Sequence, residues 1–103
     1  MLFKDTVNLI QISVGKDADG FAKNQETIRD GLFVNKKDVR SSEFYQAAAQ
    51  GIRLETMFVM RSMDYEGEKI LSHEGNKYAI ERTYDRGEMV ELVCQSRDDN
   101  HGS

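Results

Sequence analysis

The sequence predicts a mainly β protein: a small antiparallel β-barrel of about six strands, with one short helix or mobile loop between strands 2 and 3. Apolar and polar residues alternate over most of the chain, as they do on half-buried strands. Short glycine-containing turns separate the last strands. The 103 residues suffice for one domain, which we place at residues 1–96. Six short strands in one small domain leave exposed edges unless the sheet closes on itself.

The first two strands are predicted over Thr6–Gly15 and Thr27–Val39. In the first, the apolar residues change face between Leu9 and Ile10, which indicates a bulge or burial on both sides near the start of the strand. In the second, Gly31 interrupts the alternation and is a candidate bulge.

The segment between these strands, Lys16–Glu26, is polar and is predicted to be a loop, a long one for a hairpin. Phe21 lies inside it. This ring either pins the loop to the body of the protein or serves as an apolar anchor for a partner. We therefore define a candidate partner-contact loop, which consists of Asp19, Gly20, Phe21 and Lys23.

The helical signal is confined to Arg40–Arg53. Ser41 or Ser42 is placed to cap the helix, three alanines follow at 47–49, and Gly51 is placed to end it. Two to three turns are too short to persist alone in water, so the segment either docks on the barrel or orders conditionally. Its predicted anchors are Phe44 and Tyr45.

The C-terminal part of the chain is predicted to be an antiparallel meander. Its strands are expected over Leu54–Met63, Glu68–His73, Lys77–Tyr84 and Glu88–Gln95. The alternation of apolar and polar residues along these strands predicts a core that includes Phe58, Tyr78, Ile80, Val90 and Leu92.

The strand over Leu54–Met63 is apolar on both faces, with Met57 and Val59 opposite Phe58 and Met60. Such a strand needs its own core on one side and either a second layer or another subunit on the other.

Catalytic and metal-binding patterns are absent from the sequence. The two histidines are His73, predicted to be solvated in a turn, and His101, in the tail. Cys94 lies on the apolar face of the last predicted strand and is expected to be a buried, inert thiol. The carboxylates of Asp64, Glu66 and Glu68 crowd one turn and are expected to be solvated. We therefore predict no enzyme activity, no cofactor and no metal site.

The net charge and the hydropathy of the chain disfavour two further classes of protein, nucleic-acid binders and membrane proteins. The formal charge of −4, from 14 basic and 18 acidic residues, disfavours a dedicated nucleic-acid binder. No apolar run approaches the ~20 residues of a membrane span, and we expect no contact with a membrane. Residues 97–103 are polar, and we expect them to form a disordered tail.

The ordered motifs between Ser42 and Cys94 resemble those of the head-tail joining, or head-closure, proteins of tailed bacteriophages and prophages. The motifs that carry the resemblance are a Ser-x-Glu-Phe/Tyr-Tyr start over 41–45, an Asp-Tyr-x-Gly-Glu turn over 64–68, a Gly-x-x-Tyr-x-Ile strand over 75–80, Arg-Thr-Tyr at 82–84 and Glu-Leu at 91–92.

This resemblance implies a structural virion protein at the neck between capsid and tail, assembled in the cytoplasm of the bacterial host. It implies a ring of identical subunits, with a dodecamer as one candidate, built from copies that are monomeric when isolated. The ring would contact the portal or its adaptor on one side and a tail or tail-completion protein on the other. It would seal the channel after packaged DNA has passed through it. The segment that matches the channel-facing, gating part of the family consists of Ser42, Glu43, Phe44, Tyr45, Gln46, Ala47, Ala48, Ala49 and Gln50.

The alternative is a small oligonucleotide-binding β-barrel. Such a protein needs a basic groove with exposed aromatic side chains on which bases stack. Tyr78 and Tyr84 lie close in sequence to Lys77, Arg82 and Arg86, so the residue types are present.

Overall fold

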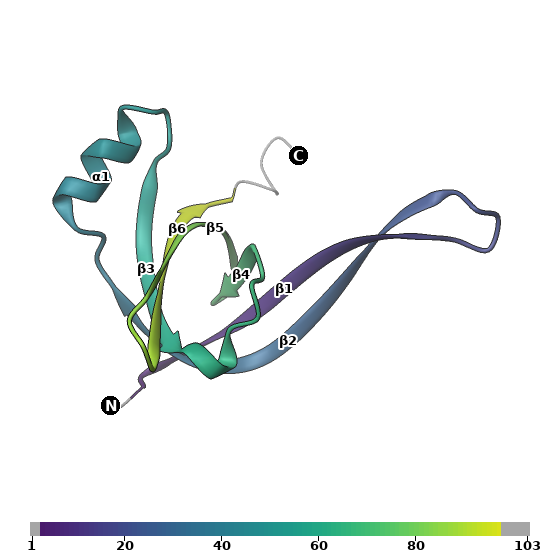
Figure 1. Ribbon diagram of the computed structural model, residues 1–103, viewed down its shortest axis with the longest axis horizontal. Helices are drawn as coiled ribbons and strands as arrows, with labels where there is room; N and C mark the ends of the chain where they lie inside the picture. Colours follow the sequence, from purple (N-terminus) through teal and green to yellow (C-terminus); the bar gives the residue numbers. More distant parts are fainter. Residues whose placement is uncertain (1–2, 98–103) are drawn as a thin grey trace.

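The computed structural model describes residues 3–97 and shows a closed antiparallel barrel of six strands with one helix (Figure 1). The predicted fold class is confirmed. Within the described residues, no helix is long and apolar enough to cross a membrane. The predicted polar tail lies outside those residues, apart from Arg97. In chain order the elements are β1 (Asp5–Lys16), β2 (Ala22–Lys37), α1 (Ser41–Ala48), β3 (Leu54–Arg61), the one-turn 3₁₀ helix η1 (Ser62–Asp64), β4 (Ile70–His73), β5 (Asn76–Asp85) and β6 (Met89–Ser96).

Around the barrel the strands follow the order β1-β2-β3-β6-β5-β4. The seam that closes the barrel is the pairing of β1 with β4, where Asn8, Leu9 and Ile10 pair with Ser72, Leu71 and Ile70. This seam is short, because β4 has four residues.

Three bulges decide which side chains reach each face of the sheet. The one predicted at Gly31 is confirmed: the β1–β2 register shifts between Val7 and Leu9, and Gly31 has a φ of 71°. The Gly31 N–H donates to Asn8 Oδ1 over 3.0 Å. The others interrupt β3 between Leu54 and Thr56, and β5 between Ile80 and Arg82.

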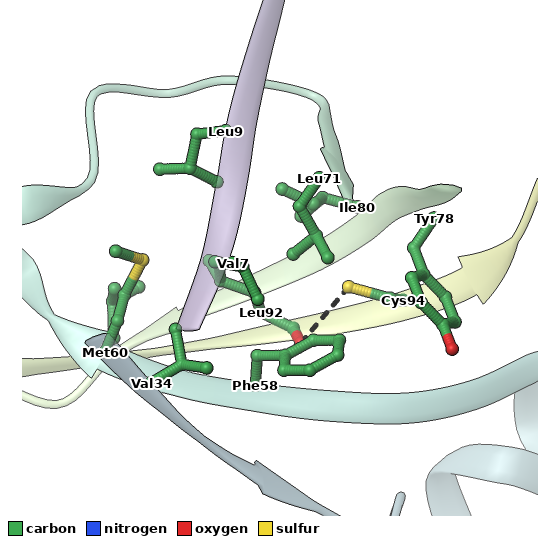
Figure 2. Packing of buried hydrophobic residues seen from close by; sticks show 11 residues of the cluster. Val7, Leu9, Val34, Phe58, Met60, Leu71, Tyr78, Ile80, Leu92 and Cys94 are labelled. Carbon is green, nitrogen blue, oxygen red and sulfur yellow. Dashed lines mark hydrogen bonds between the residues drawn. The ribbon is translucent and has the colours of Figure 1, made fainter. Parts of the chain in front are cut away.

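The inner face of the barrel forms the main hydrophobic core (Figure 2). All five residues predicted for it are buried, and the ring of Phe58 packs edge-on against Tyr78 with 5.7 Å between centroids. Cys94 is buried as predicted; burial raises the pKa of its thiol to about 12. The core consists of Val7, Leu9, Val34, Phe58, Met60, Leu71, Tyr78, Ile80, Val90, Leu92 and Cys94.

A second cluster lies on the outer face of β3 and β6, beneath α1. Ala47 of the helix packs there with Met57, Val59 and Val93. The strand that is apolar on both faces is thus covered by a second layer from its own chain. Strict alternation along β3 would place Leu54 on the face of Phe58, but Leu54 belongs to this outer cluster, because the β3 bulge shifts the alternation.

The connection between β3 and β4 is held by a buried carboxylate. Glu68 is 3% exposed, and its Oε2 lies 2.6 Å from Nη2 of Arg29 in β2. The same guanidinium donates to the carbonyl of Asp64 over 2.8 Å, and Glu68 Oε1 accepts from the Glu66 N–H over 3.0 Å. The prediction of three solvated carboxylates is therefore wrong for Glu68, which joins this turn to a strand distant in sequence.

Candidate functional site

The candidate interaction site is the part of the β1–β2 hairpin that projects from the barrel (Figure 1). The two strands stay paired as far as Lys16 and Ala22. β4 pairs with β1 only over Asn8–Ile10, and β3 pairs with β2 only over Val34–Lys37. Beyond those contacts the hairpin is a free two-stranded ribbon, and it gives the molecule its long axis of 48 Å against 32 and 23 Å.

Exposed apolar side chains of this ribbon gather on one of its faces, beside Glu26 and Asn24. Residues paired across antiparallel strands share a face, and the pairs Ile10–Ile28, Ile12–Glu26 and Val14–Asn24 alternate with polar pairs such as Ser13–Gln25. Ile10 is buried at the barrel, but Ile12, Val14 and Ile28 are 45%, 72% and 50% exposed. These three form what we call the hairpin face, and Phe21 adds a further exposed apolar side chain at the tip.

The tip of the hairpin holds Phe21 away from the barrel. The carboxylate of Asp17 accepts hydrogen bonds from the N–H groups of Asp19 and Phe21 over 2.9 and 3.0 Å, and Gly20 N–H donates to the Asp17 carbonyl over 3.0 Å. The ring of Phe21 is 71% exposed.

Two predictions about this segment are therefore corrected. Phe21 does not pin a loop to the body of the protein. The turn is also much shorter than Lys16–Glu26, because β2 starts at Ala22 and includes Lys23. Of the candidate contact loop, Asp19, Gly20 and Phe21 lie in the turn.

The candidate gating segment, Ser42–Gln50, is largely helix α1. The helix is confirmed, but it begins at Ser41 without a side-chain cap. The prediction that Phe44 and Tyr45 anchor it is wrong for Tyr45, which is 71% exposed. The helix docks instead through Ala47, which is fully buried, and through Glu43, which is 6% exposed.

A polar cluster on the outer face of the barrel holds Glu43. The β5 bulge re-aims Arg82 and Tyr84 toward the helix. The Tyr84 hydroxyl donates to Glu43 Oε2 in a short hydrogen bond, and Arg82 Nη1 lies 3.4 Å from the same oxygen. Arg40, just before the helix, lies 3.7 Å from Glu43 Oε1. Glu43 therefore fastens α1 to β5.

Glu91 extends this cluster on β6. Arg40 Nη2 donates to both of its carboxylate oxygens, over 2.9 and 3.1 Å, and Arg86 Nη2 lies 3.5 Å away. Burial acts to raise the pKa of Glu91, but the hydrogen bond and charge of Arg40 outweigh it and hold that pKa below its ordinary value.

These contacts weigh against the oligonucleotide-binding alternative. Tyr78 is buried in the core, and the Tyr84 hydroxyl is hydrogen-bonded to Glu43. Arg82 and Arg86 are paired with carboxylates. Tyr78, Tyr84, Arg82 and Arg86 thus form no exposed stacking surface with free positive charge.

A groove of about 650 Å³ with mixed polar and apolar lining lies where η1 meets the turn between β5 and β6. Met63 at its edge is 80% exposed, and the guanidinium of Arg61 lies 5.7 Å from the ring centre of Phe3. η1 follows β3 and is joined to β2 at its end, where Arg29 donates to the Asp64 carbonyl. The groove is lined by Phe3, Arg61, Ser62, Met63, Gly87, Glu88 and Met89.

The environment of His73 also differs from the sequence-based prediction. It was expected to be solvated, but it is 4% exposed, and its ring lies 5.2 Å from that of Phe58. Its Nε2 lies 3.5 Å from Oδ1 of Asp5. Nothing in the sequence near His73 signals this contact, because Asp5 belongs to another strand.

Comparison with known proteins adds no relative. No protein-family model matches the chain, and no curated protein is significantly similar to it.

Proposed function

We propose that this chain is a ring-forming component of the neck of a tailed bacteriophage, a head-closure or head-tail joining protein that assembles in the host cytoplasm and remains in the virion. The ordered motifs from Ser42 to Cys94 support this assignment. The small closed barrel is the fold that the resemblance implies. The observation that carries the proposal is the projecting hairpin, whose exposed apolar side chains call for a protein partner.

The partner of the hairpin face is a neighbouring copy in the ring. The groove beside Met63 is lined in part by Phe3 and two methionines, and methionines adapt to irregular contacts. The groove is lined by residues 3, 61–63 and 87–89, none of which belongs to the β1–β2 hairpin. A contact between two different surfaces of one subunit is heterologous, and it repeats around a closed ring when the rotation between copies allows closure. The net charge of −4 keeps copies apart until a portal or adaptor template aligns them.

The segment Ser42–Gln50 is proposed to face the channel of the ring. Its only charged residue is Glu43, which is buried and paired with Arg82. The exposed part of the segment is therefore neutral. A neutral wall neither binds nor repels the phosphates of passing DNA strongly. Because the helix is held by one small apolar residue and one polar cluster, it is the element of the fold most suited to moving when the channel closes.

The proposal is tested by co-expressing the chain with the portal and adaptor proteins encoded in the same genome. We expect the chain to co-purify with them as a ring that is visible by electron microscopy. Phe21→Ser should abolish ring formation and leave the far-UV circular dichroism spectrum unchanged. The matched control is Gln25→Ser, which alters the polar face of the same ribbon. Failure of the wild-type chain to join the complex, or normal rings from Phe21→Ser, would refute the proposal.

A further inference from the structure

Asp5, His73 and Glu74 bring three potential metal ligands together at the seam of the barrel. Each offers one ligand atom, and these atoms all lie within 4.8 Å of one another. Asp5 begins β1, His73 ends β4, and Glu74 occupies the turn between β4 and β5. Asp5 is therefore far in sequence from His73 and Glu74, so no local motif marks the three residues as a metal site.

The strand pairing points the aspartate and the histidine into the same space. Asp5 shares the parity of Leu9, and His73 shares that of Leu71; Leu9 and Leu71 are paired and face the core. The His73 side chain is 5% exposed and is held against the Phe58 ring. The Asp5 side chain is 32% exposed, so solvent reaches the group from that side. The imidazole is thus fixed in position, and a path for an ion remains open.

The separation of the two side chains fits a shared ion. His73 Nε2 lies 3.5 Å from Asp5 Oδ1. A direct N–H···O hydrogen bond has a length of about 2.7–3.2 Å. Two ligands that each lie about 2.0–2.1 Å from a tetrahedral zinc ion are about 3.4 Å apart.

No lysine or arginine of the described residues compensates the carboxylate charges at this site. Among residues 3–97, none of the lysine or arginine ion pairs involves Asp5 or Glu74. Two carboxylates and one buried imidazole form an anionic group that a divalent cation would neutralise.

The position of Glu74 is not explained by the needs of the turn. Glu74 and Gly75 form a two-residue hairpin connection with φ values of 51° and 82°. Such turns favour asparagine, aspartate or glycine at the first position, because other side chains rarely adopt a positive φ. A glutamate there keeps a carboxylate beside His73 despite this preference.

We propose that Asp5, His73 and Glu74 bind a divalent transition metal, with Zn²⁺ as the best fit. One imidazole nitrogen and two carboxylate oxygens are ligands that zinc accepts, and they leave a fourth position for water or a group from another molecule. The ion would join the start of β1 to the β4–β5 turn across the short seam that closes the barrel. This inference does not rest on the proposed phage function.

The test measures Zn²⁺ and Co²⁺ binding to the full chain after treatment with a chelator, by calorimetry and by visible absorption of the cobalt form. All variants carry His101→Ala, because His101 is the second histidine of the chain. We expect one equivalent to bind and the melting temperature to rise with metal concentration. Glu74→Gly suits the turn, so it should preserve the fold and weaken metal binding by at least about tenfold, the lower end of the loss seen for mere supporting residues. Asp5→Asn should weaken it similarly.

The matched control is Glu26→Gln, an exposed carboxylate on the hairpin, which should bind metal as the parent does. The inference is overturned if the His101→Ala protein shows no saturable binding of either ion at millimolar concentration. It is also overturned if Glu74→Gly and Asp5→Asn both bind with the affinity of the parent.

Discussion

Replacing Glu43 by alanine should free helix α1 from the barrel and leave the barrel folded. The carboxylate accepts from the Tyr84 hydroxyl and lies 3.4 Å from Arg82. A hydrogen bond to a charged group contributes about 1.5–3 kcal/mol. The Arg82 side chain is 28% exposed, so water solvates its charge once the carboxylate is gone. We therefore expect the free energy of helix opening to fall by about 1.5–3 kcal/mol, which corresponds to roughly one to two orders of magnitude in the opening equilibrium.

Hydrogen exchange followed by mass spectrometry measures this opening directly. Backbone amides of residues 41–50 should exchange faster in Glu43→Ala by that factor, whereas peptides from β3 and β6 should keep their protection. Tyr84→Phe removes the hydroxyl donor alone and should give a smaller effect in the same segment. Gln46→Ala is the matched control, because Gln46 is an exposed residue of the same helix.

Two results would contradict this reasoning. Unchanged exchange over residues 41–50 in Glu43→Ala would mean that Glu43 does not hold the helix. Equal acceleration in β3 and β6 would mean that the helix and barrel open as one unit, and the proposal that Ser42–Gln50 moves as a gate would be refuted with it.

Further predictions concern the core, the acid sensitivity and the thiol. Ile80→Ala should lower the free energy of unfolding by about 2–5 kcal/mol in urea titrations followed by circular dichroism, because Ile80 is buried in the inner core; a loss below about 0.5 kcal/mol, typical of surface positions, would contradict its assignment. The pKa of Glu91 is lowered by Arg40, so the stability from this pair is present above the ordinary carboxyl pKa and is lost as the pH falls through the lowered value. The Glu91→Gln variant should therefore lose less stability than the parent protein between neutral and acidic pH. An identical dependence of stability on pH in the two proteins would argue against this role of Glu91. The Cys94 thiol, with a pKa of about 12, should resist a thiol-specific reagent at pH 8 until the protein unfolds, and rapid labelling of the native protein would show the burial to be wrong.

Local patterns in the sequence determined the meander, the bulge at Gly31 and the helix between β2 and β3. The side chains of a half-buried strand alternate between core and solvent, so the apolar parity of Tyr78, Ile80 and Leu92 predicts the inner face directly. These features depend on residues that are near one another in the chain, and one sequence is enough to read them.

The length of the hairpin was missed because both of its faces are solvated beyond the barrel. Residues 22–26 carry no apolar alternation, so they look like a loop, although they are paired with β1. The helix was predicted, but its site on the outer face of β3 was not, because the sequence left open whether a second layer or another subunit covers that face.

Only the tertiary structure decided the environments of the polar residues. Glu43 meets Tyr84, Glu68 meets Arg29, and His73 meets Asp5 across strands that are distant in sequence. A carboxylate or an imidazole in a turn has the same local signature whether it faces water or a partner. Its burial is set by the register and bulges of the closed sheet, since a shift of one residue moves a side chain to the other face.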